Sequence, residues 1–136
     1  MIRIGILGDI GSGKSYIAKK FGYPVFNADT EVHKLYKNEI KIFHKFKKIL
    51  PKYIKSFPID KNEISNTILA KNQNLKKIIN IVHQEIRKKL KNFLKKNKNR
   101  KIIILDIPLL LENKLNNKKD ILIFVQSSKI DILKRL

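Results

Sequence analysis

The chain of 136 residues is long enough for one compact domain and too short for two full ones. It has no cysteine, which excludes a disulfide framework and thiolate chemistry, and no apolar run long enough to cross a membrane. The net charge of +20 results from 31 basic and 11 acidic residues. The basic residues are nearly all lysines and are spread along the chain.

The first predicted element is a strand over Met1–Leu7, an apolar run rich in isoleucine that leaves no room for a signal peptide. It leads into G-D-I-G-S-G-K-S at positions 8–15, which fits G-x-x-x-x-G-K-[ST], and a helix is predicted over Ser15–Phe21. Strand, glycine loop and helix in this order are typical of a phosphate-binding loop, whose backbone N–H groups attract anions. We therefore expect Lys14 on the outer phosphates of a nucleotide and Ser15 on Mg²⁺. The predicted nucleotide contacts are Gly8, Gly11, Ser12, Gly13, Lys14, Ser15 and Tyr16.

The next segments predict a short strand and two helices. Val25 and Phe26 form the strand, which ends at Asn27-Ala28-Asp29. Thr30 is predicted to cap a helix from Glu31 to about Lys37, and another helix over Glu39–Leu50 is expected to end at Pro51.

Two further helices are predicted in the middle of the chain. Asp60, with Glu63 three residues on, is a suitable N-cap for the first. The second runs from about Asn74 to Lys96 and is amphipathic. Its predicted apolar stripe is Leu75, Ile78, Ile79, Val82, Ile86, Leu90, Phe93 and Leu94.

The last third of the chain returns to strands. Ile102–Leu105 is a continuous apolar run that ends in Asp106, Ile121–Val125 is another, and a helix is predicted from Ile130. Such strands alternating with helices predict an α/β fold with a parallel sheet buried on both faces. Parallel sheets bind ligands at the carboxyl ends of their strands, so the phosphate loop, Asp29 and Asp106 are expected at one edge.

Taken together, these segments resemble the dephospho-coenzyme A kinase family. The similar segments are I-G-I-L-G-D-I-G-S-G-K-S at the start, N-A-D at 27–29, I-D-K at 59–61, H-Q-E-I-R at 83–87, L-D-I-P-L-L-L-E at 105–112 and R-L at 135–136. The family has Asp-Ala-Asp where this chain has Asn27-Ala28-Asp29, Arg in place of Lys61, Pro in place of Gln84 and usually Thr in place of Tyr16. The resemblance implies a three-layer α/β/α P-loop kinase with a parallel sheet and a helical acceptor-binding insertion.

The resemblance also implies an activity, the ATP-dependent phosphorylation of the 3′-hydroxyl of dephospho-CoA, the last step of CoA synthesis. The catalytic residues are then Asp29, as the candidate base, and Lys14, which neutralises phosphate charge, while Asp106 holds Mg²⁺, directly or through a water. From the residues alone, both carboxylates could instead cap a turn or helix, and Asp29 could order Mg²⁺. The implied CoA-binding residues are Lys61, His83, Arg87, Asp106, Pro108, Leu109 and Leu110.

A domain plan accompanies the resemblance. We expect a single domain with a core at about 1–37 and 100–136 and a CoA-binding insertion at about 38–99. Family chains continue beyond the position of Leu136 with a lid and its arginines, so these 136 residues are expected to be a poor catalyst. We expect a cytoplasmic protein; the sequence indicates no oligomeric state.

Two other interpretations stay open. One is another P-loop kinase with a small nucleotide or nucleoside acceptor, against which the D-I-P-L-L-L-E segment argues. The other is a nucleotide-binding or nucleic-acid-binding module without catalysis, favoured by the charge. Because Lys, Ile and Asn share A/T-rich codons, we interpret the charge mainly as a solvated lysine surface.

Overall fold

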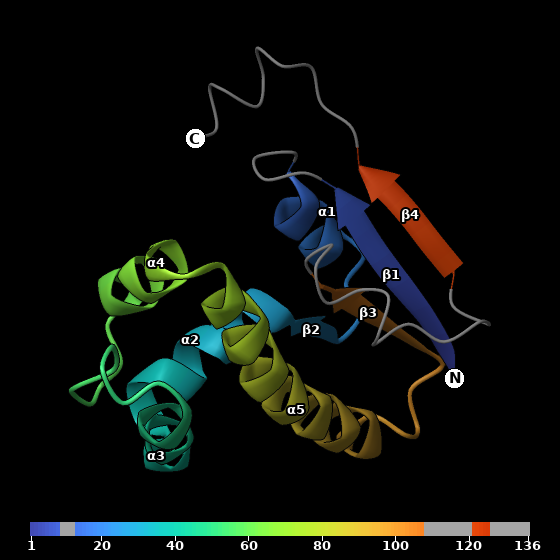
Figure 1. Ribbon diagram of the computed structural model, residues 1–136. Helices are drawn as coiled ribbons and strands as arrows, with labels where there is room; N and C mark the ends of the chain where they lie inside the picture. Colours follow the sequence, from blue (N-terminus) through green and yellow to red (C-terminus); the bar gives the residue numbers. More distant parts are fainter. Residues whose placement is uncertain (9–12, 108–120, 126–136) are drawn as a thin grey trace. The chain divides into compact units, whose positions relative to one another are not determined.

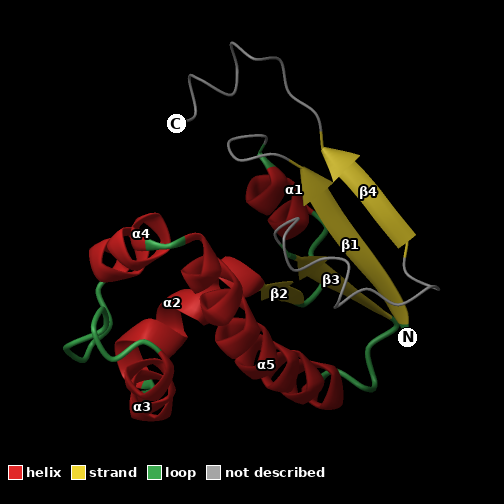
Figure 2. Ribbon diagram, viewed as in Figure 1, coloured by secondary structure: helices red, strands yellow, loops and turns green. Residues whose placement is uncertain are grey.

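A computed structural model describes residues 1–8, 13–107 and 121–125 (Figure 1). In these residues the predicted α/β fold is confirmed: two strands with a helix between them stand at the start of the chain, helices follow in the middle, and two strands lie near the end (Figure 2). The chain divides into two compact units, Met1–Asp29 with Leu90–Leu136, and Thr30–Lys89. The elements are β1 (Ile2–Gly8), α1 (Lys14–Lys20), β2 (Val25–Asn27), α2 (Ala28–Asn38), α3 (Ile40–Ile49), α4 (Lys61–Ala70), α5 (Asn72–Lys96), β3 (Ile102–Asp106) and β4 (Ile121–Val125).

The first unit holds a parallel sheet, whose order in the described residues is β2-β3-β1-β4. Strand β3 is central and pairs with β1 through Ile6 opposite Asp106, and with β2 through Asn27 opposite the same Asp106. Ile103, Ile104 and Leu105 of β3 are almost completely buried. A strand covered on both faces reads as a continuous apolar run, which is why the sequence pattern identified β3 so clearly.

The two faces of this sheet pack against different helices of the same unit. On one face, Ile104 and Ile6 are buried together with Ala18 of α1. On the other, Phe26 lies with its ring centroid 5.5 Å from that of Phe93, near the end of α5. Because successive residues of a strand point to opposite faces, Asn27 shares the α1 face with Val25, two residues before it.

The second unit is helical and has its own core. Tyr36 of α2 packs edge-on against Phe46 of α3, and burial raises the pKa of Tyr36 to about 12. Asp60 caps α4 as predicted, because its Oδ1 accepts a hydrogen bond of 2.8 Å from the backbone N–H of Asn62. The most deeply buried apolar side chains of this unit are Leu35, Ile42, Phe46, Ile54 and Ile86.

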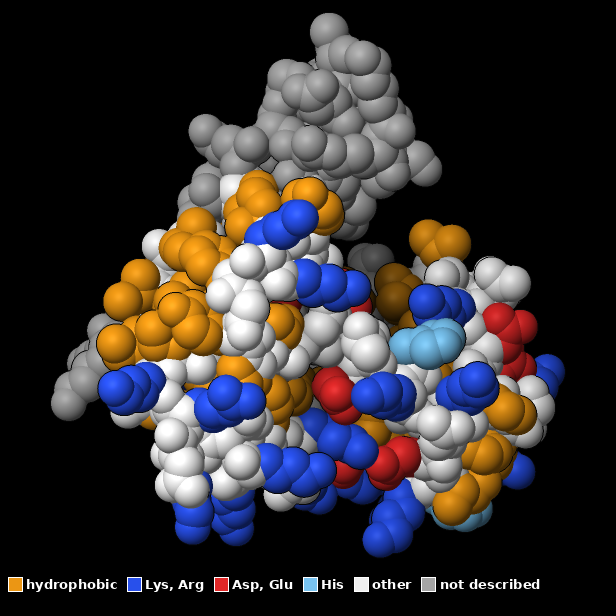
Figure 3. Space-filling model, turned by 180° about the vertical axis from the view of Figure 1, so that it is seen from behind, with side chains coloured by type: hydrophobic (Ala, Val, Ile, Leu, Met, Phe, Trp, Pro, Cys, Tyr) orange, Lys and Arg blue, Asp and Glu red, His pale blue; other side chains and the backbone are white. Residues whose placement is uncertain are grey.

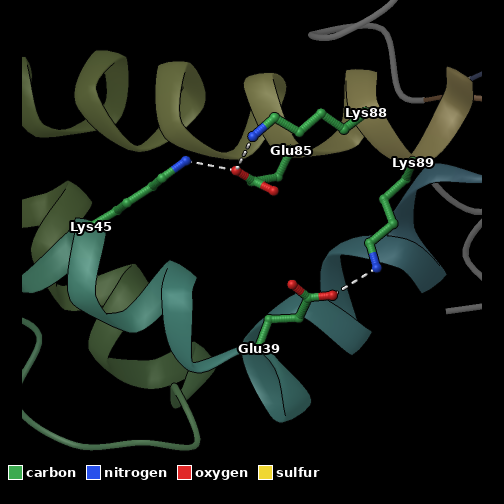
Figure 4. A network of polar contacts seen from close by, with 5 residues as sticks. All are labelled: Glu39, Lys45, Glu85, Lys88 and Lys89. Carbon is green, nitrogen blue, oxygen red and sulfur yellow. Dashed lines mark hydrogen bonds and ion pairs between the residues drawn. The ribbon is translucent and has the colours of Figure 1, made fainter.

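Two groups of ion pairs connect the helices of this unit (Figure 4). Glu85 of α5 accepts from Lys45 of α3 at 2.7 Å and from Lys88, one turn on, at 3.3 Å. Glu39, the residue before α3, pairs with Lys89 of α5 at 2.7 Å. The hydrogen bond from Lys45 lowers the pKa of Glu85, with the bond from Lys88 acting in the same direction against partial burial.

Two local predictions were wrong. Helix α2 begins at Ala28, directly after β2, so Thr30 lies inside the helix and does not cap it. Ala28 is completely buried, and its packing outweighs the local preference of threonine for a cap position. In α5, Leu75 is 38% exposed whereas Ile81, outside the predicted stripe, is 5% exposed.

Charged side chains are distributed widely over the face of the molecule seen in Figure 3. In Figure 3 lysine and arginine side chains are scattered over the visible face, with acidic side chains among them. No helix within the described residues is both long enough and apolar enough to span a membrane.

Candidate active site

The register of the sheet brings polar side chains from two strands to one point. Asn27 is the last residue of β2, Asp106 is the last residue of β3, and the two stand opposite each other in the parallel pairing. Both lie on the face that α1 covers, because Asn27 follows Val25 by two residues and Asp106 follows Ile104 by two residues, and Val25 and Ile104 pack on that face. The carboxyl edge of a parallel sheet is the usual place for a ligand in such folds.

The start of α1 delivers two more polar side chains to this point. Gly13 precedes the helix with a φ of 89°, in the left-handed region that residues with a Cβ rarely adopt. This turn directs the chain from the phosphate loop into α1, so Lys14 and Ser15 are its first two residues. The carbonyl of Gly13 already accepts the first helical hydrogen bond, from Ile17 at 3.0 Å.

The carboxylate of Asp106 is the centre of the cluster. Its Oδ1 lies 3.1 Å from the Lys14 ammonium. Its Oδ2 accepts hydrogen bonds of 2.8 Å from the Ser15 hydroxyl and 2.8 Å from the Asn27 amide. The Asn27 amide also lies 3.4 Å from the Ser15 oxygen, so the two side chains that donate to Oδ2 also contact each other.

Burial makes these contacts strong. The side chain of Asp106 is 2% exposed and that of Lys14 is 14% exposed. A charge removed from water in this way is costly unless it is paired and hydrogen-bonded, and removing one partner leaves the other uncompensated. The cluster is thus a preformed arrangement of one anion, one cation, one hydroxyl and one amide.

This arrangement suits a phosphate ester with a divalent cation. The Lys14 ammonium has three donors, so it can serve a phosphate oxygen as well as Asp106. Ser15 is exposed and offers a hydroxyl oxygen, and Asp106 offers a carboxylate; Mg²⁺ prefers oxygen ligands of these kinds. No group of three or more His, Cys, Asp or Glu side chains that could hold a metal occurs among the described residues. Phosphate oxygens and water are suitable further ligands for a cation held by Ser15 and Asp106.

The other residues predicted at the nucleotide are only partly described. Gly8 is buried at the end of β1, opposite Val125 of β4. Tyr16 is 65% exposed, and the Lys20 ammonium lies 5.1 Å from its ring centroid. Gly11 and Ser12 lie outside the described residues.

Asp29, the predicted base, is exposed on the first turn of α2, two residues beyond Asn27. The predicted acceptor residues Lys61 and Arg87 are both exposed, on α4 and α5, whereas His83 of α5 is 6% exposed. The predicted acceptor segment Pro108, Leu109 and Leu110 lies outside the described residues.

Sequence reasoning missed one member of the cluster. Asn27 was noted only as a departure from an Asp-Ala-Asp pattern, yet it binds Asp106 directly. A signal was available, since a polar residue that ends a buried parallel strand stands at the ligand edge of the sheet. What the pattern could not give was the strand order, which makes β2 and β3 neighbours.

Comparisons with known proteins agree with this geometry. The family model described as dephospho-CoA kinase matches residues 2–136. Among curated relatives, the dephospho-CoA kinase of Wolbachia sp. subsp. Brugia malayi is 38% identical over 138 residues, which cover 98% of this chain and 71% of the relative. That of Ehrlichia canis is 30% identical, over 100% of this chain and 71% of the relative.

Two solved structures are similar in fold. The protein TT1252 from Thermus thermophilus is 28% identical, with a TM-score of 0.79 over 98% of this chain and 70% of that one. A dephospho-CoA kinase from Campylobacter jejuni is 19% identical and has a TM-score of 0.60 over 98% of this chain and 92% of that one, a similarity that concerns the fold alone.

Proposed function

The chain belongs to the dephospho-CoA kinase family, and we propose that it transfers the terminal phosphoryl group of ATP to the 3′-hydroxyl of dephospho-CoA. The observation that carries the proposal is the cluster of Lys14, Ser15 and Asp106 at the carboxyl edge of the sheet. Phosphoryl transfer needs little covalent chemistry from a protein; it needs positioning and neutralisation of charge on the phosphate oxygens.

The donor side of the reaction belongs to the first unit. Lys14 places a positive charge at the outer phosphates of ATP, held in a fixed place by its ion pair with Asp106. Ser15 and Asp106 would hold Mg²⁺, which, when bound, neutralises phosphate charge. Gly8, Gly11, Ser12, Gly13 and the backbone of Tyr16 complete the proposed nucleotide contacts.

The acceptor side needs a base and contacts to a molecule that carries phosphates. We assign the base to Asp29, whose exposed carboxylate can accept the proton of the attacking hydroxyl. Lys61 and Arg87 are exposed cations suited to acceptor phosphates. His83, Pro108, Leu109 and Leu110 are the other residues we assign to dephospho-CoA. The reaction is proposed to take place in the cytoplasm.

The test is a turnover assay with ATP, Mg²⁺ and dephospho-CoA, comparing the wild type with Lys14→Ala and with Lys98→Ala as a control. Lys98 is exposed and follows α5, so its loss removes the same charge away from the cluster. We expect product from the wild type and the control and almost none from Lys14→Ala. Wild-type turnover of other nucleoside acceptors, with none of dephospho-CoA, would contradict the proposed substrate.

A further inference from the structure

Three donors contact the Asp106 carboxylate within the described part of the chain, and they differ in their other proposed roles. In the proposed function, Lys14 also binds phosphate oxygens and Ser15 also binds the cation. Asn27 comes from β2, a different segment, and lies 2.8 Å from Asp106 Oδ2. Its amide is neutral, so it competes for neither group as a charge would.

Binding of a nucleotide is therefore expected to weaken some of the contacts to Asp106 more than others. When Lys14 shares its ammonium with a phosphate and Ser15 turns its oxygen to a cation, the ion pair of 3.1 Å and the hydroxyl bond of 2.8 Å both weaken. Asp106 is 2% exposed, so water cannot replace those partners freely. Of the three donors that the described residues provide, the Asn27 amide is the one that can keep its bond of 2.8 Å.

We propose that Asn27 is a positioning residue that keeps the Asp106 carboxylate oriented for the cation while Lys14 and Ser15 engage the nucleotide. The inference rests on the proposed nucleotide site and goes beyond it, because it assigns to Asn27 the coupling between cation binding and nucleotide binding. Partners that orient a metal-binding carboxylate typically change metal affinity about 10-fold to 100-fold when they are removed.

Two substitutions are expected to change this coupling in opposite directions. Asn27→Ala removes the donor, so Asp106 is less well oriented and the cation helps the nucleotide less. Asn27→Asp has nearly the same shape but replaces the amide by a second carboxylate, 2.8 Å from Asp106 Oδ2. Two carboxylate oxygens at that distance repel each other and the phosphates unless a cation lies with them, so nucleotide binding becomes more dependent on the cation.

The measurement is calorimetric titration with a non-hydrolysable ATP analogue, in excess Mg²⁺ and in EDTA. The ratio of the two dissociation constants, EDTA over Mg²⁺, measures the coupling. We expect it to fall about tenfold in Asn27→Ala and to rise about tenfold in Asn27→Asp. A residue needed only for folding would change both dissociation constants alike and leave the ratio constant. Thermal unfolding shows that each variant is folded; if one variant is not, the ratio of the other decides.

A matched control separates position from charge. Asn92→Asp adds the same charge on an exposed position of α5 and is expected to keep the wild-type ratio. Wild-type ratios in both Asn27 variants, or an equal rise in Asn92→Asp, would overturn the inference and leave the proposed function intact. No binding of the analogue by the wild type would overturn both.

Discussion

The two units of the chain both pair lysines with a carboxylate, and they do so in different surroundings. In the first unit, Asp106 is 2% exposed and its partner Lys14 is 14% exposed. In the second, Glu85 is 14% exposed, and its partners Lys45 and Lys88 are 40% and 68% exposed. Solvent screens the second group, so it contributes little, whereas the first group is costly to bury and expensive to disrupt.

This difference in burial indicates which lysine of a lysine-rich chain belongs to a functional site. Lysines give this chain most of its net charge of +20. Those of the helical unit that form ion pairs, Lys34, Lys45, Lys88 and Lys89, are at least 32% exposed and belong to the second kind. Lys14 differs because the turn at Gly13 and the register of β3 fix it against a buried anion. Burial and geometry distinguish it, and composition does not.

The largest effect is expected from Asp106→Asn. The substitution keeps the shape but removes the negative charge that pairs with the Lys14 ammonium at 3.1 Å. We expect kcat/KM for dephospho-CoA phosphorylation to fall about 10³-fold, in the range seen when a charge-stabilising group is lost. Steady-state kinetics check this, with Asp60→Asn as the matched control. A fall of less than threefold would contradict the comparison between the two units.

The next effect concerns Asp29, an exposed carboxylate with a proposed chemical role. Asp29→Asn is expected to lower kcat about 10²-fold, because a general base is worth roughly 10²- to 10⁴-fold. Binding of the ATP analogue should remain at the wild-type level, since the cluster around Asp106 is untouched. Single-turnover kinetics and calorimetry separate the two. Full activity in Asp29→Asn would reject the assignment of the base.

A smaller effect is expected where a carboxylate of the helical unit acts on the backbone. Asp60→Ala removes the acceptor for the N–H of Asn62 at the start of α4, which should destabilise the protein by about 1 kcal/mol. Urea unfolding measures the change. Asp60→Ser retains a capping oxygen and should recover most of it; equal loss in both variants would argue against the cap.

The smallest effect is expected from Glu85→Gln. Exposed pairs of this kind contribute about 0.2 to 1 kcal/mol, and the side chains of Lys45 and Lys88 are 40% and 68% exposed. Because the pKa of Glu85 is lower in the folded protein, its contribution is complete above pH 4.5 and is lost as the pH falls through the folded value. Unfolding curves of wild type and variant should differ at neutral pH and converge as the pH falls progressively below 4.5. A loss of more than about 2 kcal/mol in the free energy of unfolding would contradict the comparison, because the Glu85 pairs would then matter as much as a buried pair.

Much of the fold followed from local patterns. The continuous apolar runs predicted β3 and β4, the cap at Asp60 predicted α4, and the glycine motif predicted the start of α1. These signals depend on residues near one another in the chain. The start of α2 at Ala28 did not follow, because burial of that alanine is a tertiary effect.

The same distinction between local sequence and tertiary packing applies to the candidate site. The sequence by itself determined the chemistry of the cluster: a lysine and a serine after a glycine loop, and a carboxylate at the end of a buried strand. Only the tertiary structure decided that Asn27 joins Asp106, since this needs β2 and β3 to be neighbours in register. Strand order and register depend on packing over the whole sheet. These two partners are 79 positions apart in the sequence, and no local pattern encodes a contact at that separation.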